Sequence, residues 1–200
     1  MPNLPGRLGN LNRELKNDGR ADPRLVAALA PFGMDGALPD GGLRDTSPLE
    51  EKLSFVGGSE PGFEGLLDAL FADVERVTDV EHSTEVIAGQ DGNQIRLHIH
   101  RPRNQTRPLP CLIHLHGGGM VVLSAENISY RHWRDMLCAT GMVVVGVEFR
   151  NAAGALGVHP YPAGLNDCMA SLEWVNQNKS NLGIDKVVVS GESGGGNLCL

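Results

Sequence analysis

The sequence predicts an α/β protein with a mostly parallel sheet flanked by helices. Two observations predict it. Short apolar runs at 111–116, 142–149 and 186–190 have the composition and the abrupt ends of strands that are buried on both faces. Segments with helical periodicity lie between these runs and are joined to them by short loops. Strands that alternate with helices in this way favour right-handed crossovers, which pair the strands in parallel.

The amino-terminal part of the chain is predicted to hold two helices. Asp22 followed by Pro23 is a typical helix start, because an aspartate can cap the helix and proline fits its first turn. Residues 33–60 are rich in Gly, Pro and Asp and lack periodicity, so we expect a long connector there. Apolar residues then recur every three or four positions over 61–77, which predicts an amphipathic helix.

At about residue 78 the period of the pattern changes to two. Residues 78–89 and 94–101 alternate, and Asp91-Gly92 between them is a turn sequence, so a hairpin is predicted. His98 and His100 lie opposite the apolar face of the second strand. We expect them to be solvated or covered by the amino-terminal helices.

Two further helices are predicted between the apolar runs. The first covers 125–140, with Ser124 as its cap and Gly141 at its end. The second begins at Pro162 and continues through 163–178. Its carboxylates Asp167 and Glu173 are expected on the surface.

Composition and charge exclude several classes of function. The 200 residues carry 17 basic and 24 acidic side chains, a net charge of −7, which disfavours nucleic acid as a partner. No apolar run approaches bilayer length and no secretory signal is present, so we expect no membrane span and a cytoplasmic location. The four cysteines form no C-x-x-C pair and are expected to be buried thiols.

A serine among glycines follows the last apolar run, in Gly191-Glu192-Ser193-Gly194-Gly195. Such glycines are either a flexible turn or the means of holding a nucleophile exposed on a tight bend. The predicted order of strand, bend and helix favours the second interpretation. Small residues at Gly191 and Gly195 would relieve crowding around Ser193, at the strand end where open α/β sheets bind ligands.

A second glycine cluster, His116-Gly117-Gly118-Gly119, follows the run 111–116. Glycines without Cβ let backbone N–H groups turn toward a bound atom and let that atom approach closely. Gly117 and Gly118 are therefore candidate donors of an oxyanion hole. The N–H of Gly194, directly after Ser193, would be a third donor at the start of a helix.

Neither glycine motif predicts a metal site or a nucleotide-binding site. His114 and His116 form an H-x-H pair, but glycines rather than further ligands follow, so no metal is predicted. The glycines fit no nucleotide-binding motif, and no cofactor is predicted. Glu192 is expected to tie down backbone rather than to activate the serine. His132 is expected at the surface or in packing, and His159 as a loop brace.

The two motifs, together with the segment 147–168, resemble the hormone-sensitive-lipase-like family of bacterial esterases, which are α/β-hydrolases. The resemblance implies a helical cap and connector over 1–76 and the amino-terminal part of the catalytic domain over 77–200. It implies Ser193 as the nucleophile and short-chain esters as substrates. The oxyanion donors it implies are Gly117, Gly118 and Gly194, with His116, Gly119, Gly191, Glu192 and Gly195 supporting the loops.

The sequence departs from the family pattern in three respects. Glu192 and Gly194 stand where Asp and Ala are common, and the link between Arg150 and His159 is longer than usual. All seven histidines precede Ser193, whereas the acid and the base of an α/β-hydrolase follow the serine. We therefore expect a longer protein, with the acid and the base beyond residue 200.

The expected function is that of a carboxylic-ester hydrolase acting through a serine acyl-enzyme. Its expected partner is a small-molecule ester, with a homodimer as the candidate assembly. The alternative is a non-catalytic protein that binds a small molecule on the same scaffold and lacks the triad histidine.

Overall fold

The computed structural model describes residues 10, 12–37 and 42–200. The remaining parts of the expected cap segment 1–76 lie outside the described residues. Contacts within the chain divide it into two units, 1–47 and 48–200, which are described separately.

The described residues of the first unit include three short helical segments: η2 (Leu15–Asn17), α1 (Pro23–Leu29) and η3 (Ala30–Phe32). The predicted helix start is confirmed, because the Asp22 carboxylate accepts a hydrogen bond from the N–H of Arg24 at 2.8 Å. None of the three segments has a buried residue.

Helix α2 (Leu49–Phe71) opens the second unit. The predicted connector over 33–60 is therefore wrong in its second half, and the helix predicted over 61–77 starts earlier and ends earlier. Pro61 lies inside α2 rather than at its start, although proline lacks an N–H and normally disrupts a helix interior. The preceding residue, Glu60, is the single buried residue of α2, so tertiary contacts hold the helix at this point.

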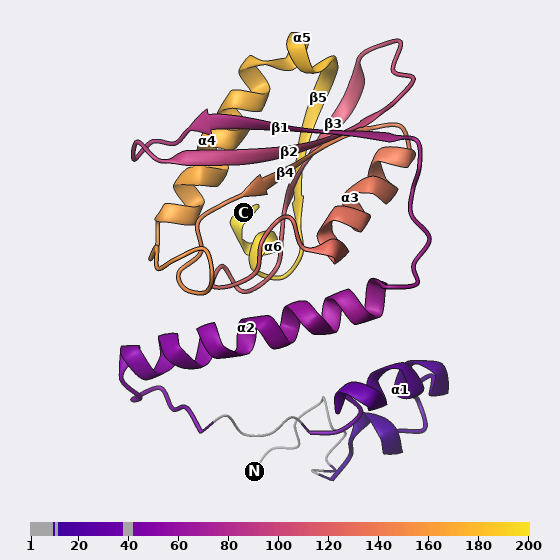
Figure 1. Ribbon diagram of the computed structural model, residues 1–200, viewed down its shortest axis with the longest axis vertical. Helices are drawn as coiled ribbons and strands as arrows, with labels where there is room; N and C mark the ends of the chain where they lie inside the picture. The colour runs from indigo at the N-terminus through magenta and orange to yellow at the C-terminus, as the bar shows by residue number, and fades with distance from the viewer. Residues whose placement is uncertain (1–9, 11, 38–41) are drawn as a thin grey trace. The chain divides into compact units, whose positions relative to one another are not determined.

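The five strands form one mixed sheet (Figure 1). They are β1 (Val80–Ala88), β2 (Gln94–Pro102), β3 (Leu109–Leu115), β4 (Val143–Glu148) and β5 (Ile184–Gly191). Their order in the sheet is β1-β2-β4-β3-β5. The predicted hairpin is confirmed as antiparallel β1–β2, and β2 is also antiparallel to β4. The strands alternating with helices pair in parallel, as predicted, with β3 between β4 and β5.

Four helices accompany these strands: α3 (Ile128–Ala139), α4 (Ala163–Gln177), α5 (Lys179–Leu182) and α6 (Gly194–Leu198). The predicted start of the first is wrong. Asn127, not Ser124, caps α3, and its side chain accepts a hydrogen bond from the N–H of Ser129. Both residue types are good caps. The Ser124 hydroxyl donates to Glu148 at 2.6 Å and accepts the N–H of Glu126 at 3.0 Å, in the turn that precedes α3.

The two faces of the sheet have different coverings. Alternate residues of β2, from Ile95 to Ile99, share a core cluster with Cys168 and Val175 of α4. On the other face Val144 of β4 packs with Cys138 of α3. The sheet is thus enclosed between α3 and α4 in the region that leads to the glycine motifs.

Two predictions about polar residues are wrong: His98 and His100 were expected to be solvated or covered by the amino-terminal helices, and Asp167 was expected at the surface. His98 and His100 are only 7% and 2% exposed, because α3 covers their face of the sheet. Asp167 is fully buried on α4, where it accepts hydrogen bonds from the guanidinium and the backbone N–H of Arg150. Glu173 is exposed, as predicted.

The strand β5 is less buried than predicted. Its residues Val188 and Val189 are 57% and 37% exposed, because β5 is the edge strand of the sheet.

The cysteines are free thiols. Cys111, Cys138 and Cys168 are buried as predicted, and burial raises the pKa of each to about 12, whereas Cys199 is partly exposed. Within the described part of the chain, none of the helices has the length and apolar character needed to cross a bilayer.

Candidate active site

Ser193 stands on the bend between β5 and α6. Its backbone has φ 50° and ψ −116°, a left-handed conformation that is unusual for a residue with a side chain, and the residue is exposed. The neighbouring glycines make this bend possible. A Cβ at Gly195 would collide with the carbonyl oxygen of Leu115, and one at Gly191 would lie 2.5 Å from the carbonyl carbon of Gly195.

The second glycine cluster forms the loop after β3. Gly118 and Gly119 have φ values of 104° and 67°, and a Cβ at Gly118 would collide with the carbonyl oxygen of Val122. Position 118 therefore requires glycine for two reasons: its positive φ is rare for other residues, and there is no room for a Cβ.

The structure brings the two motifs together. Because β3 and β5 are parallel neighbours, with Leu115 opposite Gly191, both glycine bends leave the same edge of the sheet. A Cβ at Gly117 would lie 3.7 Å from the Cβ of Ser193, and one at Gly194 would lie 2.8 Å from the Cα of Gly119. Ser193 thus lies beside both groups of candidate amides.

His116 is buried inside the loop that it begins. Its ring stacks on Phe149 at 4.2 Å, and its Nδ1 lies 2.7 Å from the carbonyl oxygen of Gly117. A carbonyl can only accept, so Nδ1 carries the proton. Burial lowers the pKa of His116 to about 4, which keeps the imidazole neutral at physiological pH.

Glu192 makes a side-chain contact that was not predicted. Its Oε1 lies 2.8 Å from Nε2 of the buried His114 on β3. Burial is the largest single effect on the Glu192 carboxyl and would raise its pKa, but the hydrogen bond and the charge interaction with His114, together with smaller effects, lower it on balance. The contact fastens the serine bend to the neighbouring strand.

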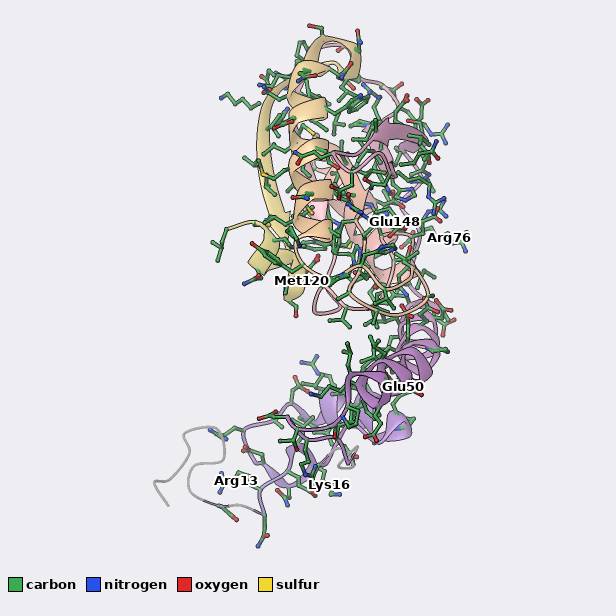
Figure 2. The ribbon with its side chains drawn as sticks, turned by 90° about the vertical axis from the view of Figure 1, so that its left-hand side faces the viewer. Arg13, Lys16, Glu50, Arg76, Met120 and Glu148 are labelled. Atoms are coloured by element: carbon green, nitrogen blue, oxygen red, sulfur yellow. The ribbon has the colours of Figure 1, made fainter. Side chains whose placement is uncertain are left out.

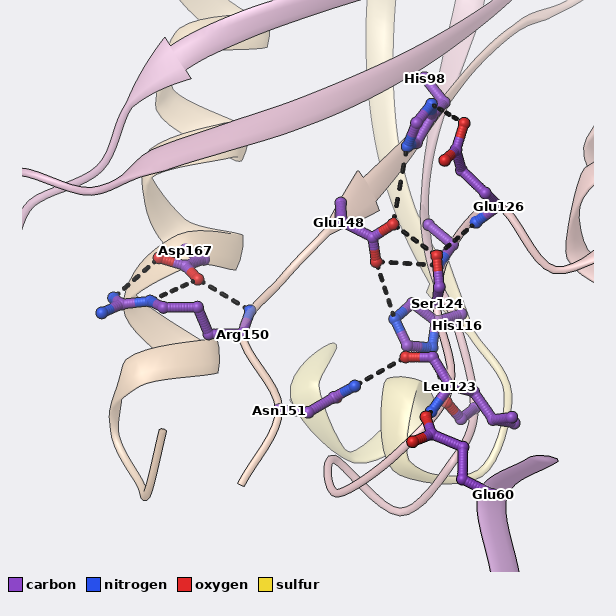
Figure 3. A network of polar contacts seen from close by, with 12 residues as sticks. Glu60, His98, His116, Leu123, Ser124, Glu126, Glu148, Arg150, Asn151 and Asp167 are labelled. Carbon is purple, nitrogen blue, oxygen red and sulfur yellow. Dashed lines mark hydrogen bonds and ion pairs between the residues drawn. The ribbon is translucent and has the colours of Figure 1, made fainter. Parts of the chain in front are cut away.

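Sequence reasoning missed Glu148 and Tyr130. Glu148, at the end of β4, accepts the hydroxyl of Ser124 and the N–H of Ala125 at 3.0 Å, and His98 lies 3.8 Å away (Figure 3). Tyr130 of α3 lies beside the loop, since a Cβ at Gly117 would be 2.9 Å from its hydroxyl. A carboxylate ending an apolar strand was the available signal for Glu148; no local pattern marked Tyr130.

A second polar cluster lies on the α3 side of the sheet. His82 Nε2 and His100 Nδ1 each lie 2.6 Å from the same oxygen of Asp135. Arg134 Nε donates to His100 Nε2 at 2.9 Å, so Nδ1 of the neutral His100 carries its proton and donates it to Asp135. The three side chains are close enough together to hold a metal ion. In this arrangement, however, Nδ1 of His100 carries a proton, so it has no lone pair to offer to a cation.

A hollow of about 630 Å³ adjoins this cluster, between α2, β1 and α3. None of its lining residues belongs to either glycine motif. The candidate site at Ser193 is therefore identified by its backbone geometry and not by the presence of this hollow.

The buried imidazoles predict a pH-dependent stability. Burial lowers the pKa of His100 and of His116 from about 6.5 to about 4. The folded protein then binds fewer protons than the unfolded chain between these values. The free energy of unfolding has its full value above pH 6.5 and decreases as the pH falls toward 4, by roughly 3 kcal/mol for each imidazole.

Urea unfolding at a series of pH values from 7 to 4 measures this loss. We expect the slope to be smaller in His100→Gln than in the parent protein. An equal slope in both would show that His100 does not contribute to it.

The comparisons with known proteins agree with this fold. Residues 112–200 match a family model described as the alpha/beta hydrolase fold. A solved structure of brefeldin A esterase, described as a bacterial homologue of human hormone sensitive lipase, is 44% identical, with a TM-score of 0.92 over 98% of this chain and 54% of that chain. The chain has the α/β-hydrolase fold, and it is similar to hormone-sensitive-lipase-like esterases. The mixed sheet flanked by helices is the part of this fold that the chain contains.

Two further relatives are similar over part of their length. The esterase Est22 is 34% identical, with a TM-score of 0.78 over 93% of this chain and 56% of that chain. A carboxylesterase, NlhH, of Mycobacterium tuberculosis is 34% identical over 117 residues, 57% of this chain and 35% of the relative. The chain therefore spans about half the length of these solved relatives and about a third of the curated one.

Proposed function

We propose that this chain contributes the nucleophile and the oxyanion hole of a carboxylic-ester hydrolase that acts on short-chain acyl esters. The observation that carries the proposal is the position of Ser193. It is exposed on a left-handed bend, directly beside the Gly117 loop. The esterase names of the similar proteins support the same class of reaction.

The proposed reaction has two steps. The Ser193 hydroxyl oxygen attacks the ester carbonyl carbon while a base removes its proton, and the negative charge moves to the carbonyl oxygen. The N–H groups of Gly117, Gly118 and Gly194 stabilise that oxygen. The intermediate expels the alcohol, which takes up the proton, and leaves an acyl-enzyme that water hydrolyses by the same route.

The base and the acid are assigned to sequence that follows Leu200, in the order that the family predicts. Among the described residues no histidine hydrogen-bonds to the Ser193 hydroxyl. His114 is bound to Glu192, and His116 is bound to the carbonyl of Gly117. The cap role of residues 1–76, the cytoplasmic location and a homodimeric assembly are part of this proposal and await their own tests.

Labelling with paraoxon tests the proposal in the complete protein. An activated serine displaces p-nitrophenol and becomes diethylphosphorylated, whereas an ordinary serine reacts very slowly. We expect one label, located by peptide mass spectrometry on Ser193. The variant Ser190→Ala is the matched control, because Ser190 is exposed on β5 three positions earlier, and this variant should label normally.

A protein that takes up no label at Ser193 would contradict the proposal. That result would favour the non-catalytic binding protein instead.

A further inference from the structure

We propose that Glu60 of α2 is a positioning residue for the oxyanion loop, an inference that rests on the proposed function. Glu60 is 3% exposed although it lies on a helix whose other residues are at least partly exposed. Its Oε1 accepts the N–H of Leu123 and its Oε2 accepts the N–H of Ala155, each at 2.6 Å. One carboxylate thus joins two loops, and Figure 3 shows it beside Leu123 of the first loop.

The first of these loops carries the candidate amides. It begins at His116 and runs through the glycines to Leu123. Met120 of this loop lies at the end of the sheet that faces α2 (Figure 2). Glu60 therefore connects α2 to the same stretch of backbone that holds Gly117 and Gly118.

The second loop follows β4 and is bonded to the first. The N–H of Ala152 donates to the carbonyl of Met120 at 2.9 Å, and the N–H of Ala153 to that of Val121 at 3.1 Å. The amide of Asn151 donates to the carbonyl of Leu123 at 2.7 Å. The two loops and the Glu60 carboxylate form one hydrogen-bonded unit.

Backbone strain in the first loop explains why it needs such a clamp. Met120 and Leu123 have φ values of 64° and 73°, which residues with side chains rarely adopt. Such conformations persist only where the surroundings hold them. The Leu123 N–H that Glu60 binds belongs to one of these two residues.

The chemistry of the side chain makes glutamate specific here. A carboxylate offers acceptors on both oxygens, and both are used for backbone donors. Glutamine would turn an NH₂ donor toward one of the two N–H groups, so one loop would be released. The Gly117 and Gly118 amides would then shift relative to Ser193, which weakens stabilisation of the oxyanion more than binding of the neutral ester.

The test uses Glu60→Gln in the complete protein, with Asp68→Asn as the matched control. Asp68 is an exposed carboxylate on the same helix. We expect kcat for p-nitrophenyl acetate to fall roughly 10- to 100-fold in Glu60→Gln, with KM nearly unchanged. The Ki of a trifluoromethyl ketone, which forms an oxyanion on the serine, should rise by the same factor. The control should match the parent protein in all three constants.

Gly154→Ala is a second variant, which tests the same inference if Glu60→Gln does not fold. Gly154 has φ 81°, and a Cβ there would lie 2.6 Å from Glu60 Oε2, so this substitution disturbs the clamp while keeping the glutamate. We expect the same joint change in kcat and ketone affinity.

Parent-like kcat in a folded Glu60 or Gly154 variant would overturn the inference, as would a lower kcat with unchanged ketone affinity. If the proposed function is wrong, the result differs. Ser193→Ala would then leave hydrolysis intact, regardless of the results for the Glu60 and Gly154 variants.

Discussion

Replacing Ser193 with alanine is expected to lower kcat/KM for p-nitrophenyl acetate by at least about 10⁴-fold. The hydroxyl is the proposed nucleophile, and alanine has no group that could form the acyl-enzyme. Stability should be preserved, because the side chain is exposed and makes no hydrogen bond within the described part of the chain. Steady-state kinetics and a urea unfolding curve on the same sample measure both quantities.

The matched control is again Ser190→Ala, which should retain the parent activity. A Ser193→Ala protein that is folded and still hydrolyses the ester at the parent rate would contradict the assignment of the nucleophile.

Replacing Gly195 with alanine is expected to have the second largest effect. The new Cβ would collide with the carbonyl oxygen of Leu115 and lie 2.6 Å from that of His116, and both are backbone atoms that cannot rotate away. The bend must therefore shift and carry Ser193 with it. We expect activity to fall more than about 100-fold, since small misplacements of reacting groups are this costly. The free energy of unfolding should fall by about 1–3 kcal/mol, the usual effect of overpacking.

Gly65→Ala is the control for this substitution. Gly65 lies on α2 and a Cβ there would meet nothing within 4 Å, so the variant should be fully active and at least as stable as the parent. Parent-like activity in Gly195→Ala would mean that the tight bend is not needed for the reaction.

The sequence predicts those parts of the structure that local patterns determine. The alternation over 78–101 predicts the hairpin, because side chains of a strand point to opposite faces in turn. The two glycine motifs each follow a strand, and parallel pairing then brings Ser193 and Gly117 to the same sheet edge. That β3 and β5 are direct neighbours, although β4 lies between them in the sequence, is seen only in the structure.

Features that depend on distant partners could not be predicted in this way. His100 is buried because Arg134 and Asp135 of α3 supply its hydrogen bonds, and nothing near His100 in the sequence indicates them. Asp167 is buried for the same kind of reason, through Arg150. A polar residue is buried when partners compensate its lost hydration, and tertiary structure provides those partners.

The boundaries of α2 also depend on distant partners and could not be predicted from the local sequence. Pro61 is typical of a helix start, yet the helix continues through it. Glu60 is bound there by loops more than sixty residues away in the chain, at Leu123 and Ala155. Neither the first half of the helix, before Pro61, nor the role of Glu60 had a local signal.

The crystal structure of the paraoxon-labelled complete protein tests the central claim most directly. We expect the phosphorus bonded to the Ser193 oxygen. Its phosphoryl oxygen should lie about 2.7–3.1 Å from the backbone nitrogens of Gly117, Gly118 and Gly194. A phosphoryl oxygen that points to solvent, away from these three nitrogens, would contradict the account.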